Sequence, residues 1–372
     1  MEKQRFEETG KGSFFGDYLY DQVVAADHFL RKLNELIEWK HYTRKLIRLY
    51  KGEGMVGRPP YDPAVLLKVE LLAYLYHLSE RQVETYLNEN LPAKYFVGLA
   101  VDEKAPDHST LTVFRERLVE RGKLKVFEEM LEEIVRTAVR RGIQFGSIQI
   151  VDSVHSVAHI NVEKDERRQK KGKPPRDPDA GWGVKHQRKV KNEKGESVEQ
   201  REYFYGYKAH ASMNAESELI TSLEVTAGGA YDGHHFTGLV EQDLRQGLPV
   251  ETYAADKGYD DGNNHFYLEL HGLHSAIRLK KTRTQKKDAN KDIWLALEQT
   301  QPYRQGLKQR YKIERKFGEA KQWHGLGRCR YLGKMGFAVQ AFLTAIALNL
   351  KRMVKLLFGV GFKTPAGAAI QG

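Results

Sequence analysis

Apolar residues recur at intervals of three and four from about residue 21 to residue 145, and this spacing predicts an all-helical N-terminal domain. The helix that starts at PAVLLKVELL has clear start signals, because Asp62 can cap it and Pro63 suits its first position. Ser79 and Gln82 form a capping-box pattern that opens the following helix. The first third of the chain is therefore expected to be a helical domain.

Near residue 146 the hydrophobic period changes from that of helices to that of strands. SIQIVDSV is short, branched and apolar on both sides of its aspartate, which is typical of a central strand covered on both faces. The pattern then predicts two more strands, helix, strand, helix, strand and a long helix, at residues 201–213, 217–226, 233–246, 251–260, 261–272, 273–279 and 304–325. This order predicts an α/β domain over residues 146–358, with a mixed sheet flanked by helices.

Two basic stretches interrupt this order. Residues 163–200 contain prolines and few apolar residues, which predicts a surface insertion or a mobile loop, and residues 278–291 form a second basic run. The apolar stretch 336–350 is shorter than the roughly 20 residues that a bilayer needs, so we expect a buried helix there. The two ends, residues 1–20 and 359–372, are expected to be flexible.

Charge and cysteine content narrow the range of functions. A formal net charge of +11 and a pI near 9.3 favour a polyanionic partner, either nucleic acid or an anionic membrane. The single cysteine, Cys329, excludes an internal disulfide framework, and the N-terminal residues lack the apolar segment of a secretory peptide, so we expect a cytoplasmic protein. Short helices in the N-terminal domain resemble a DNA-reading helix-turn-helix, but most such pairs only pack together, and both interpretations stay open.

Two aspartates mark the ends of predicted strands. Asp152 lies in an apolar run, where an ionised side chain is costly unless something compensates it. Asp256 ends its strand next to a turn at Gly258, and ligand-binding residues of α/β sheets tend to lie at such ends. Asp152 alone is more simply explained by pairing with Lys or Arg. The second acidic strand end favours a shared site.

The predicted long helix supplies a third acid. Arg310, Glu314, Phe317 and Lys321 share one face, and Phe317 should turn that face towards the sheet. A glutamate beside two aspartates is destabilising unless cations are bound. Mg²⁺ or Mn²⁺ would remove the repulsion, and two such ions about 4 Å apart can activate an attacking oxygen and stabilise a leaving one. The alternative is a solvated helix with an Arg310–Glu314 pair. Glu319 ranks below Glu314 because it lies around the helix from this face.

The remaining candidates have simpler explanations. His155, His234 and His235 have no nearby cysteine and no helical His-Glu spacing, so we expect no zinc site. Asp232 begins a predicted helix and is most simply its N-cap.

Seven motifs carry a resemblance to a known family: GRPPYDPAVLLKVELLAYLYHLSERQVE, PDHSTLTVFRERL, IVDSV, DPDAGWG, YGYKAH, ADKGYD and RYKIERKFGEAK. With these, residues 21–352 resemble bacterial and archaeal insertion-sequence transposases of the DDE type, whose catalytic domain is ribonuclease-H-like. Asp152 and Asp256 match the two catalytic and metal-binding aspartates of that family, and Glu314 matches its glutamate. The family's flanking Arg and Lys match Arg310 and Lys321.

The resemblance implies a divalent-metal enzyme, using Mg²⁺ or Mn²⁺ and two ions, that cleaves DNA at the ends of an insertion sequence and joins the freed 3′-hydroxyl to target DNA. Lys208 and Lys257 are either phosphate contacts or solvated lysines. An aspartate recurs in the family at Asp232, which leaves a supporting role near the metal open. Leu307 stands where many relatives have a tyrosine, so any role of that tyrosine in positioning DNA is in doubt here.

The implied partners are the terminal repeats of the element, target DNA and a second copy of the chain on DNA, with no membrane. We expect such a protein to be nucleoid-associated when it is bound to DNA. The alternative is a catalytically inactive, transposase-derived DNA-binding or regulatory protein. A weaker alternative is a ribonuclease-H-like nuclease unconnected with transposition.

Overall fold

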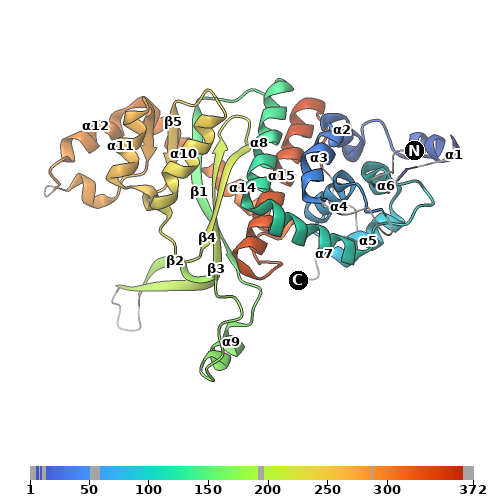
Figure 1. Cartoon of the computed structure of the whole chain (residues 1–372). Coiled ribbons are helices and arrows are strands. Elements are labelled where there is room, and N and C mark those ends of the chain that lie inside the picture. Colours follow the sequence, from blue (N-terminus) through green and yellow to red (C-terminus); the bar gives the residue numbers. More distant parts are fainter. Residues whose placement is uncertain are drawn as a thin grey trace. The chain divides into compact units, whose positions relative to one another are not determined.

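The computed structural model describes residues 6–7, 9–10, 14–50, 59–191, 197–285 and 288–362. The chain divides into two compact units, of which residues 1–127 and 347–372 form the first and residues 128–346 the second. Helices α8 (Lys123–Arg140) and α15 (Gly333–Phe358) each contribute residues to both units (Figure 1). The division between these two contact units lies within α8, whereas the hydrophobic period changes near residue 145, because a change of period marks the type of element and not the core that it packs in.

The described residues of the first unit form helices and no strand, which agrees with the predicted helical region. Besides α8 and α15, these are α1 (Phe14–Val23), α2 (Phe29–Leu36), α3 (Trp39–Leu46), the 3₁₀ turn η1 (Ile47–Tyr50), α4 (Pro63–Leu75), α5 (Glu80–Glu89), α6 (Leu91–Val97), α7 (His108–Arg117) and the π-helical turn η2 (Leu118–Gly122). Helix α1 begins at Phe14, so the segment 1–20 is not wholly flexible as expected. Residues 1–5, 8, 11–13 and 363–372 of the two expected flexible ends lie outside the described residues.

Helix α4 is the centre of the first unit. All its residues except Lys68 are buried, as expected of a helix that is apolar on every side. Asp62 accepts the amide of Ala64 at 2.8 Å, which confirms the predicted cap. The capping box of α5 is also confirmed, because Ser79 and Gln82 each accept a backbone hydrogen bond from the other.

A mixed six-stranded sheet forms the second unit (Figure 1). Its strands are β1 (Ile148–Val157), β2 (Gly181–Lys191), β3 (Ser197–Asn214), β4 (Ile220–Ala227), β5 (Thr252–Ala255) and β6 (His274–Ile277). Strand β3 runs antiparallel to β1, β2 and β4, whereas β5 and β6 run parallel to β1. Gly206 pairs with both Val157 and Gly181, so β2 and β1 lie on opposite sides of β3. The predicted mixed sheet is confirmed.

Helices cover both faces of this sheet. Val151, Ala255 and Ile277 pack in one core with Phe236 of α10 (Phe236–Arg245) and Leu268 of α11 (Gly262–Leu270).

On the opposite face, a Cβ on Gly306 of α13 (Gln301–Gln309) would lie 2.5 Å from Ala276 Cβ and 3.3 Å from Ala254 Cβ, so glycine lets α13 approach the strands closely. Helix α12 (Lys291–Gln299) precedes α13, and residues 286–287 lie outside the described residues.

The predicted long helix over residues 304–325 is two helices, α13 and α14 (Tyr311–His324). At their junction the amide of Arg310 donates to Leu307, three residues back, instead of to the residue four back. The hydrophobic period continues through the junction, which is why the sequence predicts one helix.

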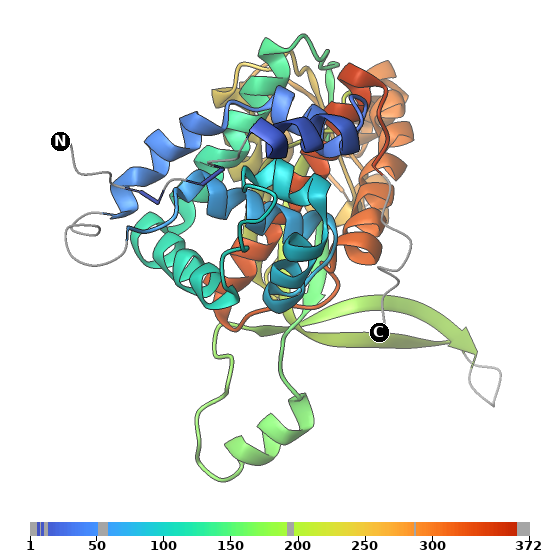
Figure 2. The same ribbon diagram turned by 90° about the vertical axis from the view of Figure 1, so that its right-hand side faces the viewer.

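The basic insertion over residues 163–200, predicted to be a surface insertion or a mobile loop, contains regular structure in its described part. It contains α9 (Val162–Gln169) and β2, and residues 192–196 lie outside the described residues. We call residues 162–176 the basic arm; Figures 1 and 2 show it projecting from one end of the sheet. Buried Asp165 accepts the amide of Arg176 at 3.1 Å and the Gln169 side chain at 2.9 Å, which closes the arm on itself.

Asp177 anchors the arm to the sheet. Its fully buried side chain accepts hydrogen bonds from the Tyr207 hydroxyl and, at 3.3 Å, from the Gly333 amide, while its carbonyl accepts the Tyr205 hydroxyl at 2.9 Å. The sequence of this stretch does not predict that it is fixed to the sheet. Segments are usually fixed by buried apolar residues, whereas here two buried aspartates, Asp165 and Asp177, have that role.

Helix α15 carries the apolar stretch at residues 336–350, and Phe337, Phe342 and Leu350 in it are fully buried. The predicted buried helix is confirmed. Among the described residues, no helix has both the length and the apolar character needed to cross a membrane.

Replacing Asp177 by Ala should release the basic arm and destabilise the second unit by about 2 kcal/mol, because the buried Tyr207 hydroxyl loses its acceptor. Urea unfolding measures the loss, and trypsin should cleave within residues 164–173 faster than in the wild type. Glu166→Ala, an exposed change on α9, is the matched control. Equal cleavage rates for all three proteins would show that Asp177 does not fix the arm.

Candidate active site

The parallel register of β1 and β5 brings the two strand-end aspartates together. The pairs Ile150–Ala254 and Val151–Ala255 are the last of this ladder, and Asp152 and Asp256 are the next residues of the two strands. Adjacent strands lie about 4.8 Å apart. By strand alternation, both side chains belong to the face of Ile150 and Ala254, which is the face that α13 covers.

The carboxyl group of Asp152 is held in an unfavourable electrostatic position. Burial raises its pKa to about 7, and the nearby Asp256 and Glu314 contribute further to the increase. Two contacts oppose the shift: the Ser153 amide donates to Oδ1 at 2.8 Å, and Arg310 Nη2 lies 3.7 Å from Oδ2. The protein therefore compensates the Asp152 charge incompletely, and a cation would fit here.

Asp256 opens the short 3₁₀ turn η4 (Lys257–Tyr259). Its Oδ1 accepts the amide of Gly258 at 2.6 Å, which fixes the carboxylate against the turn. A Cβ on Gly258 would lie 2.8 Å from that same oxygen, so a larger residue would displace the carboxylate from its present position. This confirms the predicted strand that ends at a glycine turn with its carboxylate presented.

Arg310 links the third acid to this pair. Its Nη2 atom lies 3.7 Å from Asp152 Oδ2 and 3.5 Å from Glu314 Oε1. The Arg310 side chain is only 14% exposed, whereas that of Glu314 is 59% exposed. The i, i+4 pair expected for an ordinary solvated helix is thus present, but its arginine also contacts a buried strand-end aspartate, which an ordinary surface pair does not.

Helix α14 is fixed to the sheet on both sides of Glu314. Lys312 Nζ donates to the Ala215 carbonyl at 2.7 Å, and Arg315 makes two bonds of 2.9 Å to Glu218, both in the turn between β3 and β4. Phe317 is buried, as predicted, and turns this face of α14 towards the sheet.

The rival acid and the second predicted cation lie further along α14. Glu319 pairs with Lys316 at 3.4 Å. Lys321 Nζ lies 3.2 Å from His155 Nε2 of β1, and burial lowers the pKa of Lys321. Lys321 is thus on the sheet side of α14, next to the strand that carries Asp152.

The two other predicted phosphate contacts differ in their surroundings. Lys257 is exposed in η4, one residue after Asp256. Lys208 Nζ donates to Asp232 Oδ1 at 2.8 Å and to the Ala230 carbonyl at 2.9 Å. Asp232 does not act as the expected N-cap, since neither η3 (Asp232–His235) nor α10 has a side-chain cap bond.

Sequence reasoning missed Tyr259, which lies beside the acids. It is fully buried, and its hydroxyl has no hydrogen-bond partner among the described residues. Burial raises the pKa of Tyr259 well above its usual value, and Asp152, Asp232 and Asp256 raise it further. Tyr259 follows Asp256 by three residues, but no local pattern tells a buried active-site tyrosine from a core tyrosine.

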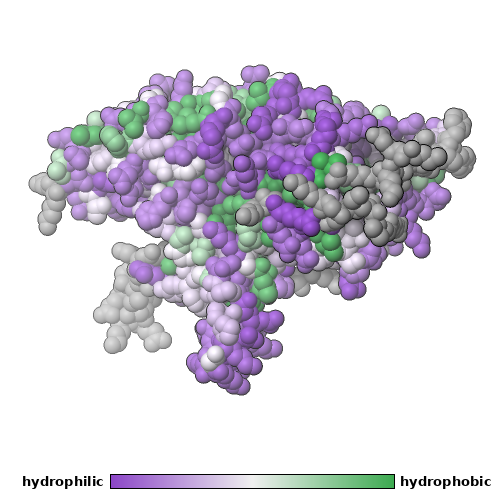
Figure 3. All heavy atoms as spheres, in the orientation of Figure 1, coloured by the Kyte–Doolittle hydropathy of each residue, from purple (hydrophilic) through white to green (hydrophobic). Residues whose placement is uncertain are grey.

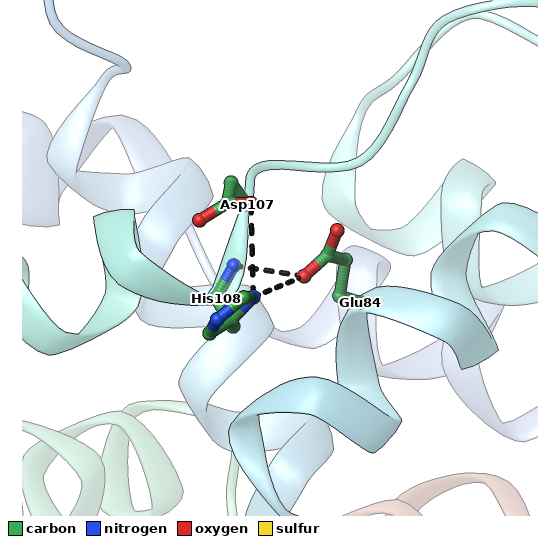
Figure 4. A group of neighbouring side chains, drawn as sticks. All are labelled: Glu84, Asp107 and His108. Atoms are coloured by element: carbon green, nitrogen blue, oxygen red, sulfur yellow. Dashed lines mark hydrogen bonds and ion pairs between the residues drawn. The ribbon is translucent and has the colours of Figure 1, made fainter.

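The first unit contains a tighter group of potential ligands, Glu84, Asp107 and His108 (Figure 4). Among the described residues it is the only set of three His, Cys, Asp or Glu ligand atoms within 4.8 Å of one another, so Asp152, Asp256 and Glu314 are less close. Glu84 Oε2 accepts both the amide and Nδ1 of His108, at 3.0 and 2.8 Å, and Asp107 caps α7 through Ser109. These contacts explain the group without an ion. Within the described residues, the histidines at 155, 234 and 235 belong to no such set.

The strand order of the second unit, with antiparallel β4, β3 and β1 followed by parallel β5 and β6, is that of a ribonuclease-H-like domain. Carboxylates at the ends of its two central strands are typical of metal-dependent phosphoryl transfer on nucleic acids.

Family comparison identifies the particular group. Residues 144–350 match the Transposase DDE domain, and residues 18–117 match a Transposase domain (DUF772). The first match covers more than half of the chain, so the chain belongs to the DDE transposases. It is an enzyme of a class that uses divalent metal ions and acts on DNA.

Three solved structures of the Mos1 transposase are also similar to the chain, each with a TM-score of 0.20. They are a paired-end complex with the left transposon end (10% identity, 79% of this chain and 88% of that chain), a strand transfer complex (11%, 87% and 87%) and a pre-cleavage transpososome (12%, 87% and 88%). At these values they support no conclusion about this chain, and the family assignment rests on the domain matches.

The raised pKa of Asp152 predicts a pH-dependent cost of folding. Ionisation of Asp152 is less favourable in the folded protein than in the unfolded chain, so its cost grows as the pH rises from about 4, the unfolded value, to about 7 and is complete above that. In EDTA, Asp152→Asn should therefore be more stable than the wild type by roughly 2–4 kcal/mol at pH 8, and by clearly less at pH 5. Denaturant unfolding at both pH values measures this.

Glu314→Gln is the control, because the Glu314 side chain is 59% exposed and should gain little. A stability difference between Asp152→Asn and the wild type that does not change with pH would contradict the prediction.

Proposed function

We propose that Asp152, Asp256 and Glu314 are the catalytic carboxylates and metal ligands of this transposase. The observation that carries the proposal is the β1–β5 register, which sets Asp152 beside Asp256 on the face where Arg310 connects Asp152 to Glu314. The exposed Glu314 side chain is the adjustable member of the set, and the two aspartates are fixed by backbone amides.

The residues fit divalent metal. Asp152 is a largely buried carboxyl group, with its side chain 18% exposed; two more acids are near it, and among the described residues one cation lies within 4 Å. Carboxylate oxygens are the ligands that Mg²⁺ and Mn²⁺ prefer, and two ions are our proposed number. When bound, such ions activate the attacking oxygen and stabilise the leaving oxygen. Arg310 would then be released from pairing with the acids to contact a DNA phosphate.

We propose two phosphoryl transfers at this one site. In cleavage, an oxygen of water bonds to phosphorus at the end of the insertion sequence, and the bond to the 3′-oxygen breaks to leave a 3′-hydroxyl. In strand transfer, that hydroxyl attacks a phosphodiester of target DNA and displaces its 3′-oxygen. Both steps have the same geometry at phosphorus, so the same carboxylates serve both.

We further propose that Arg310, Lys321 and Lys257 contact the DNA backbone near the reacting phosphate. Lys257 is exposed beside Asp256, and Lys321 lies next to β1, while Lys208 reaches the site only through Asp232.

The basic arm supplies sequence-independent affinity in this proposal. Its exposed Arg167, Lys170, Lys171 and Lys173 lie on a segment that is hydrophilic over the face shown in Figure 3. The terminal repeats, target DNA and a homo-oligomer on DNA, in the cytoplasm and nucleoid, complete the proposal.

Purified protein with Mg²⁺ or Mn²⁺ should nick or join DNA that bears the inverted repeats flanking its gene. Asp152→Asn, Asp256→Asn and Glu314→Gln should each reduce the cleavage rate at least about 100-fold while DNA binding is retained, because electrostatic stabilisation of the transition state is lost. Gel assays of cleavage and binding measure both effects, and light scattering of the complex gives its stoichiometry.

Glu319→Gln is the matched control, since Glu319 lies on the same helix and pairs with Lys316. Normal cutting by all three triad variants would overturn the site assignment. Binding of the repeats without strand breakage in any metal would instead identify an inactive, DNA-binding derivative, and cutting with no preference for the repeats would identify a general nuclease.

Replacing Arg167, Lys170, Lys171 and Lys173 together by Ala should weaken DNA binding and make it less sensitive to salt. The slope of log K against log salt should fall by roughly 0.9 for each DNA phosphate that the variant no longer neutralises. Fluorescence anisotropy at several salt concentrations measures the slope. A variant with Glu163 and Glu166 replaced by Gln, on the same arm, should bind at least as tightly as the wild type. An unchanged slope in the four-residue variant would show that the arm does not contact DNA.

A further inference from the structure

Asp232 is a carboxylate that helix formation does not explain. It begins η3 but makes no cap bond, and its Oδ1 atom accepts Lys208 Nζ at 2.8 Å. Lys208 in turn is held by the Ala230 carbonyl and is 16% exposed, so the pair is largely enclosed. The second oxygen, Oδ2, accepts no hydrogen bond from any described residue.

That second oxygen faces the proposed active site. It lies 3.7 Å from the point that a Cβ on Gly258 would occupy, and Asp256 Oδ1 lies 2.8 Å from the same point. The carboxylates of Asp232 and Asp256 therefore both lie close to Gly258. Asp232 begins η3, which leads into α10 on the sheet face opposite α13.

Two buried polar groups beside Asp232 lack a hydrogen bond of standard geometry among the described residues. The Tyr259 hydroxyl is fully buried, has the Ser153 side chain near it, and is close enough to Asp152, Asp232 and Asp256 to be affected by all three. His210 Nδ1 is likewise buried without a hydrogen bond, 3.8 Å from Asp232 Oδ1. Buried donors or acceptors without partners are costly, so a ligand or its water beside Asp232 would stabilise both groups.

The local charges leave Asp232 with one compensating cation. Among the described residues, Lys208 is the only Lys or Arg side chain within 4 Å of Asp232, and Arg310 is the only one within 4 Å of Asp152. Three aspartates are close enough to Tyr259 to affect it, and two cations lie beside them.

We propose that Asp232 is a fourth acidic residue of the divalent-metal site, beside Asp256, and that Lys208 holds its carboxylate in position. The inference rests on the proposed function, because it assumes metal at Asp152 and Asp256. Asp232 binds the metal directly or through one of its waters, and Lys208 is a positioning residue in place of a phosphate contact.

The test measures Mn²⁺ binding by the full chain without DNA, by calorimetry with MnCl₂. Asp232→Asn should weaken Mn²⁺ affinity about 10-fold or more, as expected for removal of a carboxylate at or next to the metal. The Mn²⁺ concentration for half-maximal DNA cleavage should rise by the same factor. Asp261→Asn is the matched control, because Asp261 caps α11 through Asn263 and should leave Mn²⁺ affinity unchanged.

A double variant separates metal binding from structure. Asp232→Asn leaves Lys208 buried without its partner and can lower stability for that reason alone. Adding Lys208→Met removes the unpaired charge and should restore the unfolding midpoint, while Mn²⁺ affinity stays as weak as in Asp232→Asn.

Wild-type Mn²⁺ affinity in the double variant would overturn the assignment of Asp232 and leave it a structural partner of Lys208. Failure of the wild type to bind Mn²⁺, or equal binding by Asp152→Asn, would instead overturn the proposed metal function itself. The two failures are therefore distinguishable.

Discussion

The repulsion between two carboxylates that the sheet forces together governs this molecule. Parallel pairing of β1 with β5 leaves no freedom in where Asp152 and Asp256 lie, because their strands are hydrogen-bonded up to the preceding residues. Burial and the neighbouring acid raise the pKa of Asp152 to about 7, so the fold stores an electrostatic cost at this edge. Arg310 reduces that cost, and in the proposed function a divalent metal removes the remainder.

A candidate metal site is distinguished from a structural group of acids by whether its carboxylates already have protein partners, rather than by how close the carboxylates are. Glu84, Asp107 and His108 are the tighter group, yet each has a protein partner that explains its position. Asp152 and Asp232 are less crowded, but they lie around a buried tyrosine hydroxyl that has no partner among the described residues. Proximity alone would select the first unit. Buried polar atoms without partners occur in both units, so the register that sets Asp152 beside Asp256, within the DDE domain match, is what favours the second unit.

The side chain of Glu314, the third acid, is positioned differently from those of Asp152 and Asp256. Glu314 stays exposed, while Lys312 and Arg315 on either side of it fix α14 to the turn between β3 and β4. The helix is therefore rigid where it meets the sheet, and only the Glu314 side chain is left to adjust. A fixed helix with one adjustable acidic side chain suits the proposed site, where the same residues would bind metal, accept DNA and release product.

Local periodicity determined much of this protein. Alternation and helical spacing predicted the helical first part, the mixed sheet and both strand-end aspartates, because these patterns depend on residues a few positions apart. The same spacing predicted that Glu314 turns to the sheet with Phe317, but Phe317 is buried while the Glu314 side chain is 59% exposed. The roles of these residues stay predictions. Only tertiary structure decided the break at Arg310, the anchoring of the basic arm by Asp177 and the approach of Asp232 and Tyr259 to the acids. Each of these depends on contacts between distant segments, such as Asp177 with Gly333, and neither period nor composition records which distant residues will meet.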